Sequence, residues 1–360
     1  MSIKKIAELA GTSPATVSRV LSTPDHRCQT PGLSESIWRI AKELHYLPNT
    51  AAQELRKGNT TCPAPFSVDI FLTRFDSLDK DPFFRELYVY IQDELQKNGC
   101  LLGEMLSTVD ILHANAASSS HIIPYKTPQL VENEKNTHTP AYISRKSNTG
   151  LIILGKCPPE LISFAKKRYS YITGIDRNPT NYEYDEVICC GESAAKTAVE
   201  YLISLGHKKI AYIGDCSYEA RYIGYYQSLI SHNLPLDYSN IYPTSQTREE
   251  GMKTMELILQ REELPSAIFC ANDSTALGVF DCLQRHRKKG YIPSIISIDN
   301  ILESEQTKPM LTTIDIPKKE MAHHAVNLLL DRIHNQHSNA VRIELPCRLI
   351  VRESCSYCGR

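Results

Sequence analysis

The stretch IKKIAELAGTSPATVSRVLS, residues 3–22, predicts two short helices joined by a tight turn. Its first half repeats apolar residues at helical spacing along one face until Gly11 ends the helix. Ser13 can cap the second helix, and Pro14 suits that helix's first position, where no backbone N–H is needed. A third helix, predicted from near Ser34, can cover both, so the three helices can bury one small core.

Two helices in this arrangement indicate a helix-turn-helix, in which the second helix enters the DNA major groove. Arg19 can fork onto guanine, while Thr16 and Ser18 can hold phosphates. The candidate DNA contacts are the exposed positions of the second helix: Ser13, Pro14, Ala15, Thr16, Ser18 and Arg19. The alternative is a plain three-helix bundle with a solvated face.

A further short helix is predicted for YLPNTAAQELRKG, residues 46–58, with Asn49 as its cap and Gly58 as its end. Helices shorter than about 12 residues are marginal in water even when they are rich in alanine. This helix therefore needs a partner that the local sequence does not supply. On local evidence alone, its Leu55 is more simply a residue of a small core.

Length and composition indicate a globular protein of two or three domains, with 360 residues of which 42% are apolar and 22% charged. The chain opens without a signal-peptide pattern and contains no long uncharged apolar run, so we expect a cytoplasmic protein with no membrane partner. Residues 1–58 hold eight Lys and Arg against five Asp and Glu, whereas the remainder holds 32 against 36. A basic start on an acidic body suits a nucleic-acid partner.

The twelve cysteines are scattered, and many lie inside apolar runs, which predicts buried free thiols rather than disulfides. Cys355 and Cys358 have the spacing of metal ligands, but no second Cys or His pair flanks them. We therefore expect no metal site and no cofactor.

Beyond a polar, proline-containing linker at residues 59–65, apolar runs of strand length alternate with helical stretches. The strands are predicted from FSVDIFL, CLLGEML, TGLIILG, YSYITGID, KIAYIGD, SAIFCAN and SIISID, and the clearest helices at 82–98, 193–205 and 274–285. This alternation is typical of parallel sheets covered on both faces, and predicts a doubly wound α/β body in two lobes. Residues 107–148 fit less well and are predicted as a strand, a weak helix and a surface loop.

Polar motifs follow three of the predicted strands: GDCSYEAR, ANDS and SIDN. Ligands of open α/β sheets bind at the carboxyl ends of strands, so these motifs predict a pocket between the lobes. Catalysis is not expected, because the G-x-S-x-G, Walker A, H-E-x-x-H and early G-x-G-x-x-G patterns are absent from the sequence.

Taken together, the motifs resemble the lactose/galactose repressor (LacI/GalR) family of bacterial transcription regulators. The N-terminal likeness lies in IKKIAELAGTSPATVSRVLS and IAKELHYLPNTAAQELRKG. In the body, YLISLGHKKIAYIGD, ARYIGY, FCANDSTALGVF, SIISIDN and PMLTTIDIPKKEMAHHAVNLLLDRI follow in the family's order. The strings GLIILGKCPPELISF, YEYDEVICC and LPCRLIVRES are most similar to the branch of the evolved β-galactosidase repressor.

The resemblance implies an N-terminal all-α helix-turn-helix DNA-binding domain at residues 1–58, which includes a hinge helix at 49–56. It also implies a two-lobed α/β core at 66–360 that is similar to periplasmic binding proteins. Lobe 1 is expected at about 66–175 and 300–325, and lobe 2 at about 176–299 and 326–360.

In this family the hinge helix folds when two subunits sit side by side on the operator. The resemblance implies that Leu55 wedges into the minor groove there, with Asn49 and Arg56 also at the DNA. Such wedges unstack a base step at a cost of a few kcal/mol, which the contacts of bent DNA offset. The implied partners are a pseudo-palindromic double-stranded operator and a second copy of the chain, because no leucine heptads follow IVRES to support a larger assembly.

The resemblance also implies the effector contacts, which are Phe83, Ser217, Arg221, Asn272 and Asp299. Arg and carboxylate groups suit the vicinal hydroxyls of a sugar, because they fix donor and acceptor directions. Asn272 and Asp299 could instead cap loops, and Phe83 or Phe84 could pack a helix. Gln246 stands where relatives often carry an aromatic, so the pocket's shape is expected to differ from theirs.

We therefore expect a repressor of carbohydrate-utilisation genes that galactose or a galactoside releases from its operator. The alternative effectors are another mono- or disaccharide, or a phosphorylated co-regulator that acts in the opposite sense. The alternative function is that of a periplasmic-type sugar-binding protein without a transcriptional role.

Overall fold

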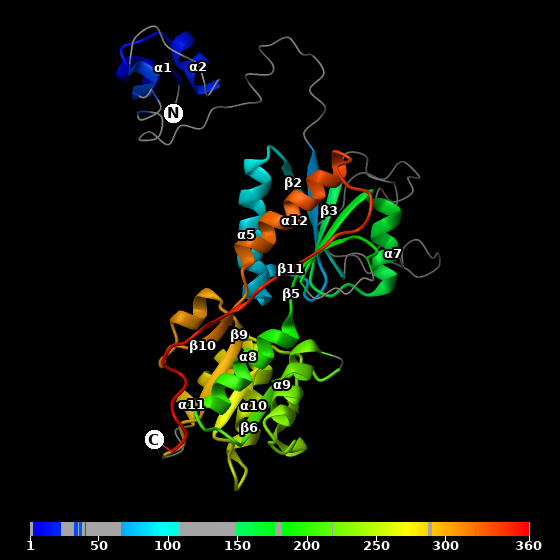
Figure 1. Ribbon diagram of the computed structural model, residues 1–360, viewed down its shortest axis with the longest axis vertical. Helices are drawn as coiled ribbons and strands as arrows, with labels where there is room; N and C mark the ends of the chain where they lie inside the picture. Colours follow the sequence, from blue (N-terminus) through cyan, green and yellow to red (C-terminus); the bar gives the residue numbers. More distant parts are fainter. Residues whose placement is uncertain are drawn as a thin grey trace, which may run out of the picture. The chain divides into compact units, whose positions relative to one another are not determined.

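The computed structural model describes residues 3–22, 32–34, 36, 37, 40, 66–108, 149–176, 182–217, 219–286 and 290–359. For residues 3–5, 18, 19, 21 and 22 it describes the backbone alone. The chain divides into two compact units, Met1–Ala64 and Pro65–Arg360 (Figure 1). The predicted hinge helix, with Asn49, Leu55 and Arg56, and residues 109–148 lie outside the described residues.

In the N-terminal unit, the two predicted helices are present as α1 (Ile3–Leu9) and α2 (Pro14–Ser22). Gly11 makes the turn between them at a φ of 62°, a conformation that glycine adopts without steric cost. Leu33, Ser34, Ser36, Ile37 and Ile40 belong to a third helical stretch. The buried core of this unit joins all three stretches and consists of Ile6, Ala7, Val17, Val20, Ile37 and Ile40.

The second unit contains two six-stranded sheets. The first has the order β11-β5-β4-β3-β1-β2 and is parallel throughout. Its strands are β1 (Ser67–Leu72), β2 (Leu101–Ser107), β3 (Thr149–Leu154), β4 (Tyr171–Ile175), β5 (Asp185–Cys189) and β11 (Arg342–Leu345). The helices packed against it are α5 (Pro82–Lys97), α7 (Pro159–Arg168) and α12 (Lys318–Ile333). We call this sheet with its helices lobe 1.

The second sheet has the order β12-β10-β9-β8-β6-β7 and is parallel except for the antiparallel pair of β10 and β12. Its strands are β6 (Ile210–Gly214), β7 (Ile241–Pro243), β8 (Ala267–Cys270), β9 (Ser294–Asp299), β10 (Thr312–Asp315) and β12 (Arg348–Ile350). Its helices are α8 (Gly191–Ser204), α9 (Ala220–Ser231), α10 (Arg248–Leu259), α11 (Asp273–Arg285) and the short 3-10 helix η3 (Leu302–Glu305). This is lobe 2.

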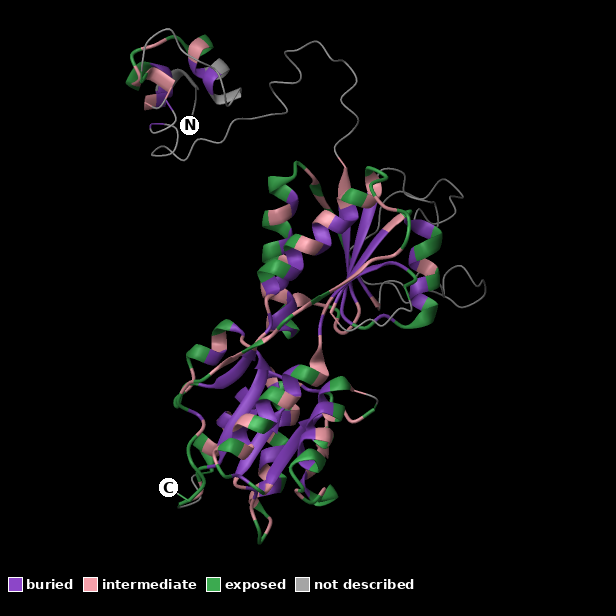
Figure 2. Ribbon diagram, in the orientation of Figure 1, coloured by how far each residue is buried: buried purple, intermediate pink, exposed green. Residues whose placement is uncertain are grey.

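Both sheets are covered on two faces. Successive residues of a strand point to opposite sides, so neighbouring residues pack against different helices. In β1, Val68 and Ile70 pack with α5 and α12, whereas Phe71 packs with α7. In lobe 2, Tyr212 of β6 belongs to the core that includes α8 and α9, whereas Ala211 packs with α10 and α11. Figure 2 shows the strands buried and the outer helix faces exposed. The prediction of doubly wound parallel sheets is confirmed.

The lobe boundaries predicted from the sequence are wrong at three strands. β5 and β11, which were expected in lobe 2, belong to the sheet of lobe 1, and β10, expected in lobe 1, belongs to lobe 2. The chain therefore crosses between the lobes after β5, after β10 and after β11 (Figure 1). The apolar pattern of a buried strand is the same in either sheet, so it carries no signal for the choice.

Among the described residues, no helix combines the length and the hydropathy that a membrane span requires.

Candidate functional site

A cavity of the core unit lies between the two lobes. Two cavities of about 230 and 500 Å³ share Phe83, Lys156, Asp176 and Asp299 in their linings. We call the pair the interlobe cavity. The predicted site residues Phe83, Arg221 and Asp299 all line it, although Asp299 lies on lobe 2 and Phe83 on lobe 1. The structure thus brings together three of the five predicted effector contacts.

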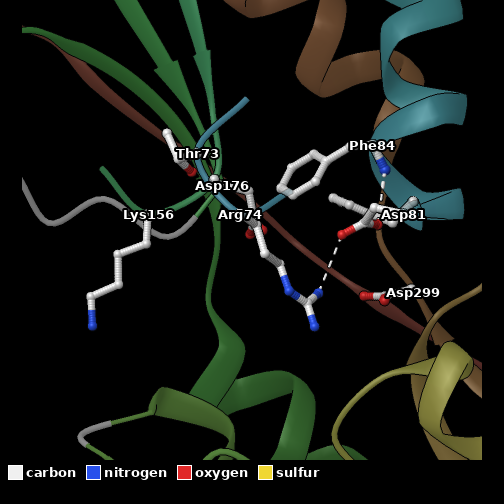
Figure 3. Close-up of a pocket in the computed structure, with 9 residues that line it drawn as sticks. Thr73, Arg74, Asp81, Phe84, Lys156, Asp176 and Asp299 are labelled. Atoms are coloured by element: carbon white, nitrogen blue, oxygen red, sulfur yellow. Dashed lines mark hydrogen bonds and ion pairs between the residues drawn. The ribbon is translucent and has the colours of Figure 1, made fainter. Parts of the chain in front are cut away.

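Lobe 1 contributes side chains from the carboxyl ends of its strands and the start of α5. Lys156 follows β3 and Asp176 follows β4, while Asp81 caps α5 by accepting a hydrogen bond from the Phe84 N–H at 3.3 Å. Phe83 and Phe84, both 6% exposed, pack edge to face with ring centroids 5.3 Å apart. Figure 3 shows Phe84, Asp81 and Asp299 around the smaller cavity.

Arg221 is the most firmly held cation of the cavity and is only 2% exposed. Its Nε donates to Glu219 at 2.9 Å, Nη1 to the Ala271 carbonyl at 2.6 Å and Nη2 to the Gln246 Oε1 at 2.8 Å. These bonds use three of the five N–H groups of a guanidinium. Arg221 is the second residue of α9, so its position is fixed by the helix as well as by its partners.

Gln246 joins the two lobes at the edge of the cavity. Arg74 of lobe 1 donates from Nη2 to the carbonyls of Ser245, at 2.8 Å, and Gln246, at 3.0 Å. The Nη1 of the same Arg74 meets Asp81 at 3.2 Å (Figure 3). Since the Gln246 side chain holds Arg221 and its carbonyl holds Arg74, the two arginines are tied to one residue.

Asn272 is placed as the cap of α11 rather than at the cavity wall. Its Oδ1 accepts from the Thr275 N–H at 3.0 Å, and its Nδ2 donates to the Gln246 carbonyl at 3.1 Å. Ser217 is exposed, with its N–H bonded to Asp215 at 2.8 Å. Neither residue is among the described residues that line the interlobe cavity. Of the five predicted effector contacts, Ser217 and Asn272 therefore lie outside the cavity lining.

Positive φ angles occur at several non-glycine residues of the core unit, and two of these residues line the cavity. Asp176, Gln246 and Asp299 have φ angles of 63°, 62° and 124°, although none is glycine. Such conformations cost of order 1–3 kcal/mol each and persist where the surroundings hold them. Lys318 holds the Asp299 carbonyl from its Nζ at 2.6 Å. Asp176 and Asp299 line the cavity, whereas Gln246 acts through the two arginines that it holds.

A second set of contacts joins the lobes beside Asp299. Arg85 of α5 pairs with Glu303 of η3 at 2.6 Å, and Glu86 accepts a hydrogen bond from the Leu302 N–H at 2.7 Å. Glu86 also meets Lys318 at 3.2 Å. These polar contacts between the lobes can exchange with water if the lobes separate.

Asp273, next to Asn272, connects β9, β10 and the residue before η3 by hydrogen bonds. It accepts hydrogen bonds from the hydroxyls of Ser297 and Thr313 and from the Ile301 N–H. Burial raises the pKa of Asp273 to about 6, although these three hydrogen bonds act in the opposite direction. Because Ile301 precedes η3, Asp273 links the β9 and β10 ends to the interlobe contacts.

The cavity lining carries more negative than positive groups. Among the described residues that line it, six are carboxylates and four are cations. The carboxylates are Asp81, Asp176, Glu192, Glu219, Asp299 and Glu344, and the cations are Arg74, Lys156, Arg221 and Arg342. Three of these cations already pair with a carboxylate. Arg74 pairs with Asp81, Arg221 with Glu219, and Arg342 with Glu186 at 2.9 Å.

In the N-terminal unit, the predicted DNA contacts lie at the start of α2. Ser13, Pro14 and Ala15 are exposed and Thr16 is half-buried, while Ser18 and Arg19 lie in α2 with side chains outside the described set. The Ser13 hydroxyl caps α2 by accepting from the Thr16 N–H at 3.1 Å and contacts the Thr16 hydroxyl at 2.9 Å. The helix end that would face DNA is therefore well ordered by its own cap.

Sequence reasoning missed Arg74, Asp81, Lys156, Asp176 and Arg342. A signal for two of them was present, because Lys156 and Asp176 directly follow apolar strands, where parallel sheets bind ligands. The same signal was present for Arg74, which lies two residues after β1. Arg342 begins β11 and reaches the cavity through the pairing of β11 with the distant β5, for which a single sequence has no signal.

Comparison with known proteins agrees with this two-unit architecture. The model of the bacterial regulatory proteins, lacI family, matches residues 2–49, and that of the periplasmic binding protein-like domain matches residues 199–355. The repressor PurR of Mannheimia succiniciproducens is 26% identical over 98% of both chains. The repressor CytR of Escherichia coli strain K12 is 29% identical over 98% of this chain and 95% of its own.

Solved structures show the same fold. A complex of the transcriptional regulator CelR with cellobiose has a TM-score of 0.64 at 20% identity and covers 99% of this chain and 100% of its own. A lac repressor dimer bound to operator and the anti-inducer ONPF has a TM-score of 0.61 at 20% identity and covers 98% of both.

A helix-turn-helix unit followed by a two-lobed core with a cavity between its lobes defines a ligand-responsive DNA-binding regulator. The chain belongs to the lacI family of bacterial regulatory proteins and is a transcriptional repressor of that family.

Proposed function

We propose that this repressor controls carbohydrate-utilisation genes and leaves its operator when a neutral polyhydroxylated effector occupies the interlobe cavity. Galactose or a galactoside is the favoured effector, on the resemblance of three core segments to the evolved β-galactosidase repressor branch. The observation that carries the proposal is the lining of the cavity, where carboxylates outnumber cations and two aromatic rings lie among them.

Neutral hydroxyl groups fit this lining better than an anion does. A carboxylate accepts a hydroxyl hydrogen and a guanidinium donates to its oxygen, so the two together fix a vicinal diol. A phosphorylated co-regulator would meet a surplus of carboxylates, and Arg74 and Arg221 already meet Asp81 and Glu219. Phe83 offers an apolar surface to the C–H face of a sugar ring.

Relatives support a saccharide without identifying it. The CelR neighbour is a complex with cellobiose, and another lacI-type neighbour from Enterococcus faecium, at 23% identity, carries ribose. The relatives that match over nearly the whole chain include PurR and CytR, so ligands other than galactosides belong in any screen.

On the DNA side, we propose that a dimer of the chain binds a pseudo-palindromic operator through Ser13, Pro14, Ala15, Thr16, Ser18 and Arg19, with the 49–56 segment at the minor groove. The lac repressor dimer bound to operator supports this arrangement by its fold. The lacI family match at residues 2–49 disfavours a binding protein without a transcriptional role.

The proposed mechanism is a linkage between the two sites. The effector bridges the lobes at Arg221 and Asp299 of lobe 2 and Phe83 of lobe 1, and so favours one relative position of the lobes. It can shift operator binding only by its differential affinity for the two positions, and operator must change effector affinity by the same factor.

A thermal-shift screen of the full-length protein identifies the effector class. The panel contains neutral mono- and disaccharides, their phosphates, nucleosides and nucleobases. A ligand at 100 times its Kd stabilises the folded state by about 2.7 kcal/mol, which raises Tm in proportion to the logarithm of concentration. We expect shifts from neutral sugars, galactosides among them. Shifts confined to sugar phosphates or to nucleobases would refute the proposed effector class.

A further inference from the structure

Outside the interlobe cavity, Glu256, Cys282 and His286 bring three different metal-binding groups to one place in lobe 2. The carboxylate oxygen, the thiol sulfur and the imidazole nitrogen all lie within 4.8 Å of one another. Glu256 belongs to α10, Cys282 to α11, and His286 caps the end of α11. We propose that these three side chains form a binding site for a divalent zinc-like cation on lobe 2.

The separation of His286 and Glu256 is within ion-pair distance and is also close to the spacing of two zinc ligands. The His286 Nε2 and the Glu256 Oε1 are 3.7 Å apart, which is beyond hydrogen-bond length. Zinc bonds of about 2.0–2.3 Å in a tetrahedron hold neighbouring ligand atoms roughly 3.5 Å apart. Movements of less than about 1 Å, within the reach of side-chain torsions, would therefore complete the site.

The backbone holds the three side chains in place. Cys282 and His286 are one helical turn apart, and the His286 N–H donates to the Cys282 carbonyl at 2.9 Å. The backbones of α10 and α11 are in contact, because a Cβ added at Gly251 would meet the Thr275 carbonyl and one added at Gly278 the Arg248 carbonyl. Such close packing leaves little freedom in the separation of Glu256 from Cys282.

A second tie between the helices lies beside the site. Arg248 of α10 forms a bidentate pair with Asp281 of α11, from Nε at 2.6 Å and Nη2 at 2.8 Å. Asp281 directly precedes Cys282, so this pair fixes the start of the turn that carries both α11 ligands. The carboxylate of Asp281 is engaged by Arg248 and so leaves Glu256 as the acidic ligand of the site.

The chemistry of the donors selects a borderline cation. A thiolate, an imidazole and a carboxylate together are typical ligands of Zn²⁺, whereas Mg²⁺ and Ca²⁺ prefer oxygen alone. Cys282 is fully buried, while the side chains of His286 and Glu256 are 55% and 42% exposed, so a cation can enter from solvent. Three protein ligands leave the fourth position of a tetrahedral zinc open to water.

Metal binding requires the thiolate form of Cys282, so binding must release the thiol proton. A bound divalent cation compensates the charges of this thiolate and of the Glu256 carboxylate together.

The test is a cobalt titration of the full-length protein, first stripped with a chelator and kept reduced. We expect one equivalent of Co²⁺ to bind with the ultraviolet charge-transfer absorption of a cobalt–thiolate bond, and Zn²⁺ to displace it. The second readout is Tm, which should rise with Zn²⁺ and should not rise with Mg²⁺.

Variants of the two exposed ligands avoid disturbing the core. His286→Gln and Glu256→Gln should each weaken Zn²⁺ binding by more than the roughly 100-fold that loss of a supporting group costs. His334→Gln is the matched control, since His334 is an exposed histidine at the end of α12. Cys282→Ala should remove the charge-transfer band, and Cys358→Ser, at an exposed thiol, should leave it unchanged.

Zinc affinity and charge-transfer absorption that survive His286→Gln and Cys282→Ala would overturn the proposal and assign binding to other thiols. Absence of any stoichiometric Co²⁺ or Zn²⁺ binding by the reduced protein would overturn it as well, leaving Cys282 as a residue of the α10–α11 core.

Discussion

Replacement of Arg221 by alanine tests the effector site most sharply, because it removes three contacts at once. Glu219 loses the donor at 2.9 Å, and the Ala271 carbonyl and the Gln246 Oε1 lose theirs. Glu219 has a side chain only 10% exposed, so its carboxylate is left in a poorly hydrated position.

The effect on folding follows from this burial. Breaking a buried ion pair by removing one partner costs about 3–5 kcal/mol, and part of the Glu219 charge can be recovered by water that enters the cavity. We therefore expect a loss near the lower end, about 3 kcal/mol, which corresponds to a fall in Tm of roughly 6–10 °C. The N-terminal unit is separate from this change, so operator binding at low temperature should persist.

Arg221→Ala should also lower the affinity for the effector. A hydrogen bond from a charged donor contributes about 1.5–3 kcal/mol, so losing it weakens effector binding by roughly 10- to 150-fold. Calorimetric titration with the effector found by the screen measures this loss, and a mobility-shift assay with operator DNA measures the response.

Arg261→Ala is the matched control for this experiment. Arg261 also lies in lobe 2 and donates to several groups, among them the Ser239 carbonyl, Asn240 and Tyr242. It is not among the described residues that line the interlobe cavity. Its loss should lower Tm and leave effector affinity within about twofold of the wild type. An unchanged effector affinity in Arg221→Ala would refute the assignment of Arg221 to the site.

Three further changes have defined outcomes. Leu55→Ala should weaken specific operator binding far more than effector binding, by mobility shift and calorimetry, because the wedge of bent DNA is lost; equal operator affinity would remove Leu55 from this role. Asp185→Asn should lower stability by about 2 kcal/mol in urea unfolding, because Asp185 loses its charged bonds to Arg332 at 2.6 and 2.7 Å. Burial is the largest influence and acts to raise the pKa of Asp185, but the hydrogen bonds from Arg332, the Val341 N–H and His337 together outweigh it and hold that pKa below its ordinary value of 3.8. The stabilisation from the bonds to the Asp185 carboxylate is therefore full above about pH 4 and is lost as the pH falls through the lowered pKa. If Asp185→Asn lost stability in acid as steeply as the wild type does, this reasoning would be refuted. Gly278→Ala should cost about 2 kcal/mol or more in the same assay, since the added methyl group meets the Arg248 carbonyl, and a neutral result would contradict the close helix packing.

The architecture was predictable because each level of the sequence pointed the same way. Gly11 and the Ser13–Pro14 start fixed the helix-turn-helix, and uninterrupted apolar strands indicated parallel sheets. The sequence did not show which lobe each strand joins. β5 and β10 are both largely buried, and a buried strand has the same apolar pattern in either sheet. Their assignment depends on long-range pairing, such as that of β11 with β5, which local pattern does not encode.

The site was predictable only in part, for a similar reason. Arg221 and Asp299 follow strand ends of lobe 2 and carry recognisable motifs, and both line the cavity. Asn272 has an equally recognisable motif, but its side chain caps α11 and donates a hydrogen bond to the Gln246 carbonyl. Arg74 follows β1 without any motif, and it becomes part of the site because its guanidinium reaches the Gln246 carbonyl of the other lobe.

The central claim is that effector and operator binding are coupled through one chain. The most direct measurement is a reciprocal titration of the full-length protein, with operator DNA selected by the protein from a random pool. Operator affinity is measured with and without saturating effector, and effector affinity with and without saturating operator, at one salt concentration. Each ligand should weaken binding of the other by the same factor, of about 5- to 150-fold. Operator affinity that is unchanged by saturating effector would contradict this coupling.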